Sequence, residues 1–277
     1  MNGMETPWTT YSTSVNFNAP WHQLTHAWLG SSYSTAFYEP VKNSQVRDAL
    51  QKIARETEED YQNIQQVLID LGVKVQRPFI DPELTIMDYV DPQSGQLNYQ
   101  KSGSFTLIPK PPMQPRDCML VVNNQLVTTN NDSSWFKENI NCLNLSEQQI
   151  SRAPLPFDAP LATIVGDCII VDCREHPWLN EYFSQQFPDY KIKPVFIGGH
   201  NDAVFSLLKP GLLVSTYHHS NYTETLPGWT VKFIENQSWN AIPAWRQIKH
   251  SNHGKWWVPD SNANPEFGEF VNTWLGQ

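Results

Sequence analysis

The chain lacks long apolar runs. No window approaches the roughly 18 consecutive apolar residues that a transmembrane helix needs. Its first residues, MNGMETPWTTYSTSVNF, contain neither a basic segment nor an apolar stretch, and a secretory signal peptide requires both. The sequence therefore predicts a protein of the cytoplasm without a membrane partner.

Signals for metals, cofactors and nucleic acids are also absent. The four cysteines, Cys118, Cys142, Cys168 and Cys173, show no CxxC spacing, so we expect neither a zinc site nor a disulfide framework. No GxGxxG or Walker sequence occurs, and nothing predicts a nucleotide or another cofactor. The net charge of −9 argues against nucleic acid as the main partner, because phosphate backbones are bound by clustered Lys and Arg side chains.

The sequence does contain enough apolar residues for a sizeable core. Hydrophobic residues make up 40% of the 277 positions, which favours a folded α/β protein over a disordered one. We expect a single domain over 1–277 with an irregular leader at 1–23. Strand and helix patterns alternate at roughly 50–70 residues, which predicts about four units of a radial or solenoid-like array.

Apolar spacings of three and four from Gln45 to Leu71 predict a long amphipathic helix. Gly72 follows it directly and is typical of a helix C-terminus. The remaining expected elements are strands at 24–30, 73–78, 166–173, 190–199, 211–218 and 228–235, a hairpin at 117–130 that turns at Asn123 and Asn124, and a helix at 176–187.

Four stretches carry candidate functional residues. Asp117 heads an apolar strand in PRDCMLVV, and Asp158 lies between prolines in PLPFDAP. His200 and Asp202 stand in GGHNDAVF, where an extended backbone would put both on one face. The fourth stretch is the Trp-rich tail. Each also has a structural interpretation, since aspartates at strand starts often cap turns, a His-x-Asp pair can be a local polar network, and tail tryptophans often belong to a core or an interface.

Together these residues suggest a chemistry. Ionised carboxylates only accept hydrogen bonds, and a guanidinium offers a planar fork of donors. A nearby histidine can move protons near neutral pH. The carboxylates of Asp117, Asp158 and Asp202, with His200, would form a pocket for a guanidino or amidino group. Reaction at its carbon needs a strong nucleophile, most readily a cysteine thiolate.

In their order, the motifs resemble those of the guanidino-modifying enzymes of the pentein fold, and within them the glycine (arginine) amidinotransferases. PRDCMLVVNNQLV resembles the Pro-Arg-Asp strand of that family, and PFDAPLATIVGDCIIVD resembles its Phe-Asp-Ala segment. GGHNDAVFSLLKPGLLVS resembles its His-x-Asp-Ala-x-Phe sequence, followed by Pro-Gly and a strand. The similarity is best over 112–235. It implies a pentein-type propeller of ββαβ modules around a pseudo-fivefold axis, with about four modules present and the fifth missing or partial.

The resemblance also implies residue roles. His200 would be the general acid and base, and Asp158 would pair with His200 or with the guanidinium. Asp117, Asp202 and Arg116 would bind the substrate. In the family, a cysteine attacks the guanidinium carbon of a donor such as arginine, and an amine acceptor then receives the amidino group.

The sequence departs from the family pattern at two places. None of its cysteines lies in the Gly-rich C-terminal segment that carries the family's nucleophile, and Cys118 and Cys168 are expected to be buried core thiols. We therefore expect a C-terminally truncated or split form whose thiol comes from a complementary fragment. The family's arginine after the GLLVS strand is replaced by Tyr217, His218 and His219.

Alternative functions remain open at this stage. A hydrolytic relative such as a deiminase would use water in place of the amine. A non-catalytic protein could bind a guanidino ligand on the same scaffold. The sequence does not name the acceptor amine, and a homodimer remains an open arrangement.

Overall fold

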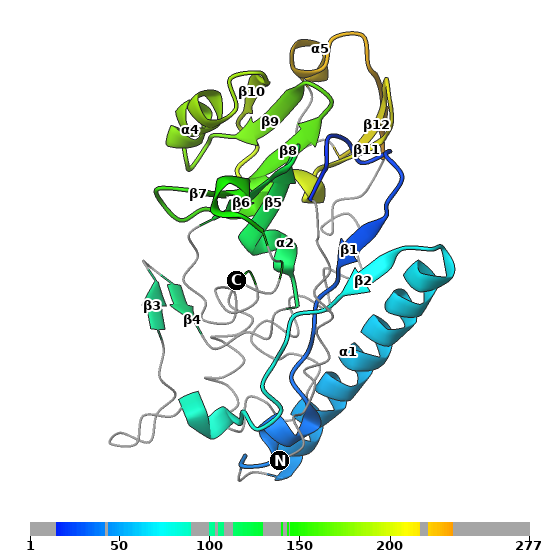
Figure 1. The fold of residues 1–277 in the computed structure, drawn as a ribbon, viewed down its shortest axis with the longest axis vertical. Helices are drawn as coiled ribbons and strands as arrows, with labels where there is room; N and C mark the ends of the chain where they lie inside the picture. The colour runs from blue at the N-terminus through cyan, green and yellow to red at the C-terminus, as the bar shows by residue number, and fades with distance from the viewer. Residues whose placement is uncertain are drawn as a thin grey trace. The chain divides into compact units, whose positions relative to one another are not determined.

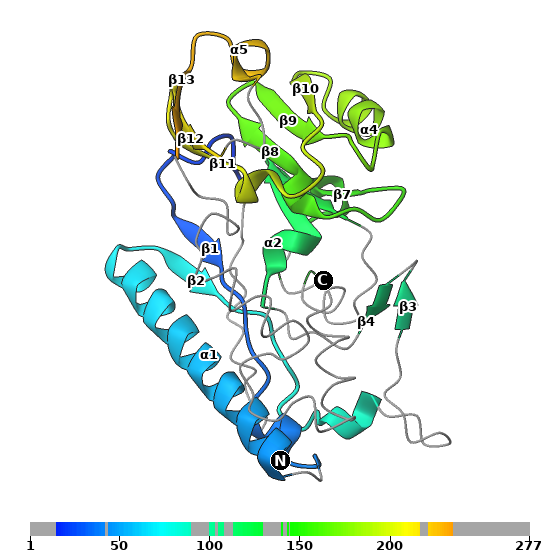
Figure 2. The same cartoon turned by 180° about the vertical axis from the view of Figure 1, so that it is seen from behind.

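The computed structural model describes residues 15–41, 44–89, 100–102, 105–107, 113–129, 140, 143, 145–216 and 221–234. The chain falls into two compact units (Figures 1 and 2). The α1 unit comprises Thr25–Gln114 with Ser238–Gln277, and the module unit comprises Met1–Leu24 with Pro115–Gln237. Of the helices in the described ranges, none has the length and apolar character needed to cross a membrane.

A long helix dominates the α1 unit. Helix α1 spans Ser44–Asp70 and confirms the predicted amphipathic helix. Gly72 ends it at a φ of +80°, a left-handed conformation that glycine adopts without steric cost. The helix joins two parallel strands, as a parallel pair requires a crossover. The other elements of this unit are β1 (His26–Trp28), β2 (Lys74–Gln76), β3 (Gln100–Ser102), β4 (Phe105–Leu107), η1 (Thr35–Tyr38) and η2 (Ile86–Tyr89).

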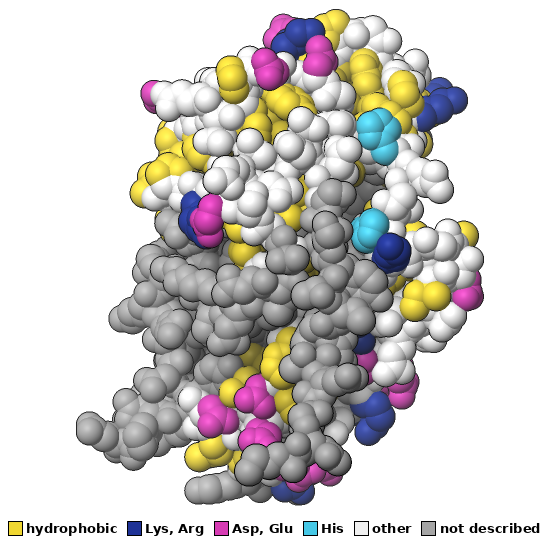
Figure 3. Space-filling model, in the orientation of Figure 1, with side chains coloured by type: hydrophobic (Ala, Val, Ile, Leu, Met, Phe, Trp, Pro, Cys, Tyr) yellow, Lys and Arg dark blue, Asp and Glu magenta, His cyan; other side chains and the backbone are white. Residues whose placement is uncertain are grey.

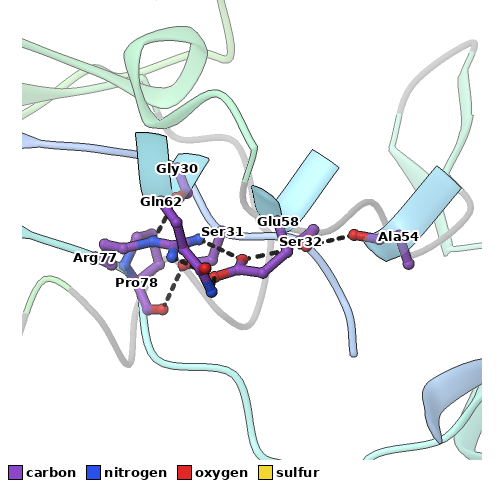
Figure 4. Close-up of polar contacts among 8 residues, drawn as sticks. All are labelled: Gly30, Ser31, Ser32, Ala54, Glu58, Gln62, Arg77 and Pro78. Carbon is purple, nitrogen blue, oxygen red and sulfur yellow. Dashed lines mark hydrogen bonds and ion pairs between the residues drawn. The ribbon is translucent and has the colours of Figure 1, made fainter. Parts of the chain in front are cut away.

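One arginine links α1 to the ends of both strands (Figure 4). The Arg77 guanidinium meets the Glu58 carboxylate through two hydrogen bonds, Nη1 to Oε1 at 2.6 Å and Nη2 to Oε2 at 2.7 Å. Arg77 Nε also donates to the carbonyl oxygen of Gly30 at 3.0 Å. These contacts lower the pKa of Glu58, chiefly through the hydrogen bond from Arg77. A bidentate pair of this geometry fixes orientation as well as charge.

The module unit repeats one topology. Each of its sheets has three strands, in which the first pairs antiparallel with the second and the second pairs parallel with the third. The parallel pairing again requires a crossover, and α4 (Trp178–Gln186) and α5 (Tyr222–Thr225) lie in two of the crossovers. The strands are β5 (Met119–Val122), β6 (Gln125–Thr128) and β7 (Ile150–Arg152); β8 (Ala162–Val165), β9 (Cys168–Asp172) and β10 (Lys191–Val195); and β11 (Phe205–Lys209), β12 (Leu212–Ser215) and β13 (Thr230–Phe233).

The spacing of these modules is regular. Their first strands begin at Met119, Ala162 and Phe205, which are 43 residues apart. The period of roughly 50–70 residues predicted from the sequence was therefore too long for this part of the chain. The hairpins within these modules are tight, since Asn123 and Gly166 adopt positive φ values in turns of two residues.

The middle module is buried on both faces of its sheet. Ile169 and Val171 of β9 belong to an apolar cluster that also contains β5, β6 and α4 residues. Ile170, which points to the opposite face, belongs to a second cluster with β11 and β12 residues. This explains the continuous apolar run CIIV, because a strand that is covered on both faces has no solvent-facing side.

Charged side chains of both signs lie beside one another on the face drawn in Figure 3. In the module unit, Lys191 Nζ lies 2.6 Å from Asp167 Oδ2, and Arg152 Nη1 lies 2.8 Å from Glu147 Oε2. Both pairs lower the pKa of the carboxylate, mainly through the hydrogen bond from the basic partner. Because these pairs are solvent-exposed, they contribute little to stability.

Candidate functional site

The predicted site residues come from three short helical turns. Each turn directly precedes the first strand of a module: α2 (Pro115–Cys118), η4 (Ala159–Leu161) and η5 (Asn201–Ala203). The turns occupy equivalent positions in modules 43 residues apart, and η4 contacts both α2 and η5. The repeat therefore brings together motifs that are far apart in the sequence.

Asp158 and His200 meet in this cluster. His200 Nε2 lies 3.4 Å from Asp158 Oδ2, a distance that is compatible with one of the two pairings that the family resemblance implies for Asp158. Asp158 precedes η4 and His200 precedes η5, yet among the described residues neither side chain caps the turn that follows it. The side chains remain 57% and 37% exposed, respectively, so a ligand can reach them.

Asp202, Arg116 and Asp117 form the second part of the cluster. Arg116 Nη2 donates a hydrogen bond to the carbonyl oxygen of Ala162 at 2.7 Å, which links α2 to the start of β8. Although the Arg116 side chain as a whole is exposed, desolvation by the surrounding protein lowers the pKa of its guanidinium, and the charges of Asp202 and then Asp117 oppose this effect. The charges of two candidate carboxylates thus act on one candidate cation.

The backbone does not stay extended from His200 to Asp202. His200 and Asp202 do not lie on one face of a strand, because η5 begins between them. Asp202 is exposed and acts on Arg116, whereas His200 faces Asp158. The residue between them, Asn201, is fully buried.

Two residues around this loop were missed in the sequence. Asp172, at the end of β9, accepts hydrogen bonds from the backbone N–H groups of Gly198 and Gly199 at 2.5 Å and 2.9 Å. Asn201 Nδ2 donates to the carbonyl oxygen of Leu161 at 2.9 Å. Both side chains are buried in a region that the sequence presents as apolar strand and turn, which gave no reason to single them out.

Two of the described cysteines, Cys168 and Cys173, are not activated nucleophiles. Burial raises the pKa of the Cys168 and Cys173 thiols, which disfavours the reactive thiolate. The prediction of buried core thiols was wrong for Cys118 and Cys168, since both are only half-buried: Cys118 ends α2 and Cys168 begins β9. Cys173 is buried instead, at 3% exposure.

Several predicted features lie outside the described residues. They are Cys142, the segment Tyr217–His219 that replaces the family's arginine, and the Trp-rich tail. Within the described ranges, no group of three or more His, Cys, Asp or Glu side chains could hold a metal ion.

Comparison with known proteins finds solved structures that share the fold of this chain. No family model and no curated protein matches the chain. The inosamine-phosphate amidinotransferase StrB1 from Streptomyces griseus superposes with a TM-score of 0.58 at 17% identity, covering 79% of this chain and 75% of that one. SxtG, an amidinotransferase of the saxitoxin biosynthetic pathway from Microseira wollei, gives a TM-score of 0.57 at 14% identity and covers 81% and 78%.

The chain has the pentein fold of these amidinotransferases. At these identities the likeness is one of fold, and it confirms the predicted α/β class and pentein-type fold. Three modules that share one strand topology are present in the described part of the chain, and two of them have a described helix in the crossover. Closure around a fivefold axis stays a prediction, as do the roles of the individual site residues.

Proposed function

We propose that the chain binds a guanidino compound at the turns α2, η4 and η5, and that it belongs to an amidino-transferring enzyme. The observation that carries the proposal is the Asp158–His200 pair, 3.4 Å apart and open to solvent beside Asp202 and Arg116. A carboxylate that orients a histidine is the arrangement a general acid and base needs. The amidinotransferase fold supports this reading of the pair.

In the proposed reaction, Asp202 and Asp117 hold the guanidinium, and a thiolate attacks its carbon. The bond from that carbon to the donor's substituted nitrogen breaks, and His200 supplies the proton that the leaving amine takes up. An acceptor amine then attacks the amidino carbon, gives a proton to His200, and expels the thiolate. Protons and electrons balance over the two halves, so no cofactor takes part.

In this proposal the nucleophilic thiol is neither Cys168 nor Cys173, because the pKa values of both thiols are raised. A complementary polypeptide segment is the source that fits the departure from the family pattern. The second candidate function is a protein that binds the guanidino ligand at the same turns without turning it over.

The first test is binding of arginine, measured by isothermal titration calorimetry. We expect Asp202→Asn to weaken binding roughly tenfold or more, because it removes a charge that a guanidinium requires while preserving shape. Asp167→Asn is the matched control, since Asp167 is an exposed aspartate in the β8–β9 hairpin, at the far end of β8 from η4. Equal affinities of the Asp202 and Asp167 variants would contradict the proposal.

A second measurement separates the candidate reactions. The chain, alone and with a complementary segment that carries the thiol, is incubated with arginine and a panel of amines, and the products are identified by mass. An amidinated amine with ornithine indicates transfer, and citrulline indicates hydrolysis. Binding without either product supports the non-catalytic candidate.

A further inference from the structure

The feature that the proposed reaction leaves unused is the buried carboxylate of Asp172. Its side chain is 2% exposed, and it lies at the edge of the sheet where β9 and β10 both end. Oδ2 accepts the N–H groups of Gly198 and Gly199, and Oδ1 accepts the N–H of Arg174 at 3.0 Å. All these donors are backbone groups, two of them in the loop that leads to His200.

The equivalent residues of the other modules show what this position ordinarily does. Thr129 and Ser215 lie 43 residues before and after Asp172, and both are buried at the end of a second strand. Thr129 Oγ1 donates to the carbonyl oxygen of Cys118 at 3.1 Å. Ser215 Oγ lies within hydrogen-bonding distance of the carbonyl oxygen of Val204, at 3.2 Å, and also contacts the carbonyl oxygen of Thr216 and the hydroxyl of Tyr222. In both modules a hydroxyl ties the end of the second strand to the turn before the first.

In the middle module, a different side chain donates to the carbonyl oxygen of the turn before the first strand. Leu161 lies 43 residues from both Cys118 and Val204, and its carbonyl oxygen accepts a hydrogen bond from Asn201 Nδ2 instead. A carboxylate has no hydrogen to donate, so Asp172 cannot replace the hydroxyl. Asn201 also donates to the carbonyl oxygen of Ile170 at 3.2 Å. Because Asn201 donates to Leu161, Asp172 does not need to make that contact and binds the start of the His200 loop. Asn201 fixes the other end of the same loop.

The loop between these anchors is held closely. Gly198 has a φ of +81°, and Arg174 packs beneath it while its Nη1 donates to the carbonyl oxygen of Ile197 at 3.1 Å. His200 therefore stands between backbone fixed by Asp172 on one side and a buried side chain, Asn201, on the other. These two anchors fix the backbone from which the His200 ring faces Asp158.

We infer that Asp172 and Asn201 are positioning residues that hold His200 against Asp158. The catalytic meaning of this inference rests on the proposed function, but the geometry does not. Asp172 replaces a structural hydroxyl of the repeat with a carboxylate in the module that precedes the histidine. A displacement of a catalytic group by about 1 Å can cost on the order of 100-fold in rate, so such a substitution has a clear advantage.

The test uses the NMR signals of the His200 imidazole, assigned by their absence in His200→Gln. In the otherwise unchanged chain, Asp158→Asn should shift these signals because the two side chains are in contact. We call this shift of the His200 signals on Asp158→Asn the His200 response. In a chain that also carries Asp172→Thr, which restores the hydroxyl residue of the other modules, we expect the His200 response to be lost. Thr129→Val is the matched control, since it removes the equivalent hydroxyl of the first module, whose partner is Cys118 and not the His200 loop, and the response should remain.

Three results would overturn the inference. The first is a His200 response that persists in both Asp172→Thr and the isosteric Asp172→Asn. The others are a response lost equally in Thr129→Val, and no response in the unchanged chain. If the Asp172 variants do not fold, through-hydrogen-bond couplings from the Gly198 and Gly199 amides to the Asp172 carboxylate are measured in the unchanged chain, and their absence refutes the anchor. Arginine titration is independent of these readouts. Failure to bind arginine with the His200 response intact would remove the proposed function and leave the positioning role.

Discussion

At the scale of single residues, the site depends on backbone conformations that few side chains allow. Gly198 combines a positive φ with close contact, because a Cβ atom there would lie 2.7 Å from Arg174 side-chain atoms. Asn201 shows a different constraint. It is fully buried, its amide donates twice, and its Oδ1 finds no donor among the described residues. Such an unpaired buried oxygen costs free energy, which the two backbone contacts offset.

A comparison of Gly198→Ala with Gly211→Ala separates the cost of the positive φ from the cost of the contact with Arg174. Both glycines have positive φ values, +81° and +78°, but nothing lies within 4 Å of a Cβ atom at Gly211. We expect Gly211→Ala to lower the free energy of unfolding by about 1 kcal/mol through backbone strain alone. Gly198→Ala should cost about 1 kcal/mol more, because Arg174 must move and lose its hydrogen bond to Ile197.

The free energy of unfolding is measured by urea denaturation, with tryptophan fluorescence as the signal. In an Arg174→Ala background, the extra cost of Gly198→Ala should vanish, since the crowding side chain is gone. Equal losses for the two glycine variants in the unchanged chain would mean that Arg174 yields without cost.

At the scale of elements, α1 is held to its strands by a charged contact as well as by apolar packing. The apolar cluster of this unit gathers Tyr33, Phe37, Leu50 and Ala54 around the first half of the helix. The Glu58–Arg77 pair lies further along, with 34% and 19% of the side chains exposed. Its position lets one guanidinium bind the helix and the segment after β1 at the same time.

Glu58→Gln should destabilise the α1 unit by about 1–2 kcal/mol at neutral pH, since Arg77 loses its charged partner. The pKa of Glu58 is lowered below its ordinary 4.5 by folding, so the folded state binds this proton more weakly than the unfolded chain does. The stabilisation is therefore complete above about pH 4.5 and is lost as the pH falls through the folded-state pKa. The two proteins should converge in stability in acid.

The matched control is Glu56→Gln on the same helix. Glu56 pairs with Lys52 at 3.7 Å, but both side chains are well exposed, so the change should stay within about 0.5 kcal/mol. Thermal unfolding of the three proteins between neutral and acid pH makes the comparison. A Glu58 variant as stable as the Glu56 variant at neutral pH would show that the bidentate pair contributes nothing.

Sequence patterns predicted the elements with strong periodicity and the residues that belong to motifs. The period of α1 and the hairpin turn at Asn123 were visible locally, and the motifs pointed to Asp158 and His200. Strand β7 was not predicted, because Ile150 is the one apolar residue among its three and the strand shows neither an apolar run nor an alternation. Asp172 was missed because its partners lie 26 residues further along, and only the register of β9 and β10 brings them together.

At the scale of the whole chain, the modules share their cores through alternate residues of one sheet. In β9, Ile169 faces the cluster that contains β5, β6 and α4, and Ile170 faces the cluster that contains β11 and β12. Both side chains are fully buried. The middle module is thus the part through which the first and third modules of this unit are packed together.

Two neighbouring substitutions should accordingly weaken different regions. Ile169→Ala and Ile170→Ala each remove the same groups from a fully buried site, so each should cost about 3 kcal/mol. Because the side chains point to opposite faces, Ile169→Ala should speed amide hydrogen exchange first in β5, β6 and α4. Ile170→Ala should speed exchange first in β11, β12 and α5. Each variant is the other's control, and identical exchange patterns would mean that the modules open only as one cooperative unit rather than through separate cores.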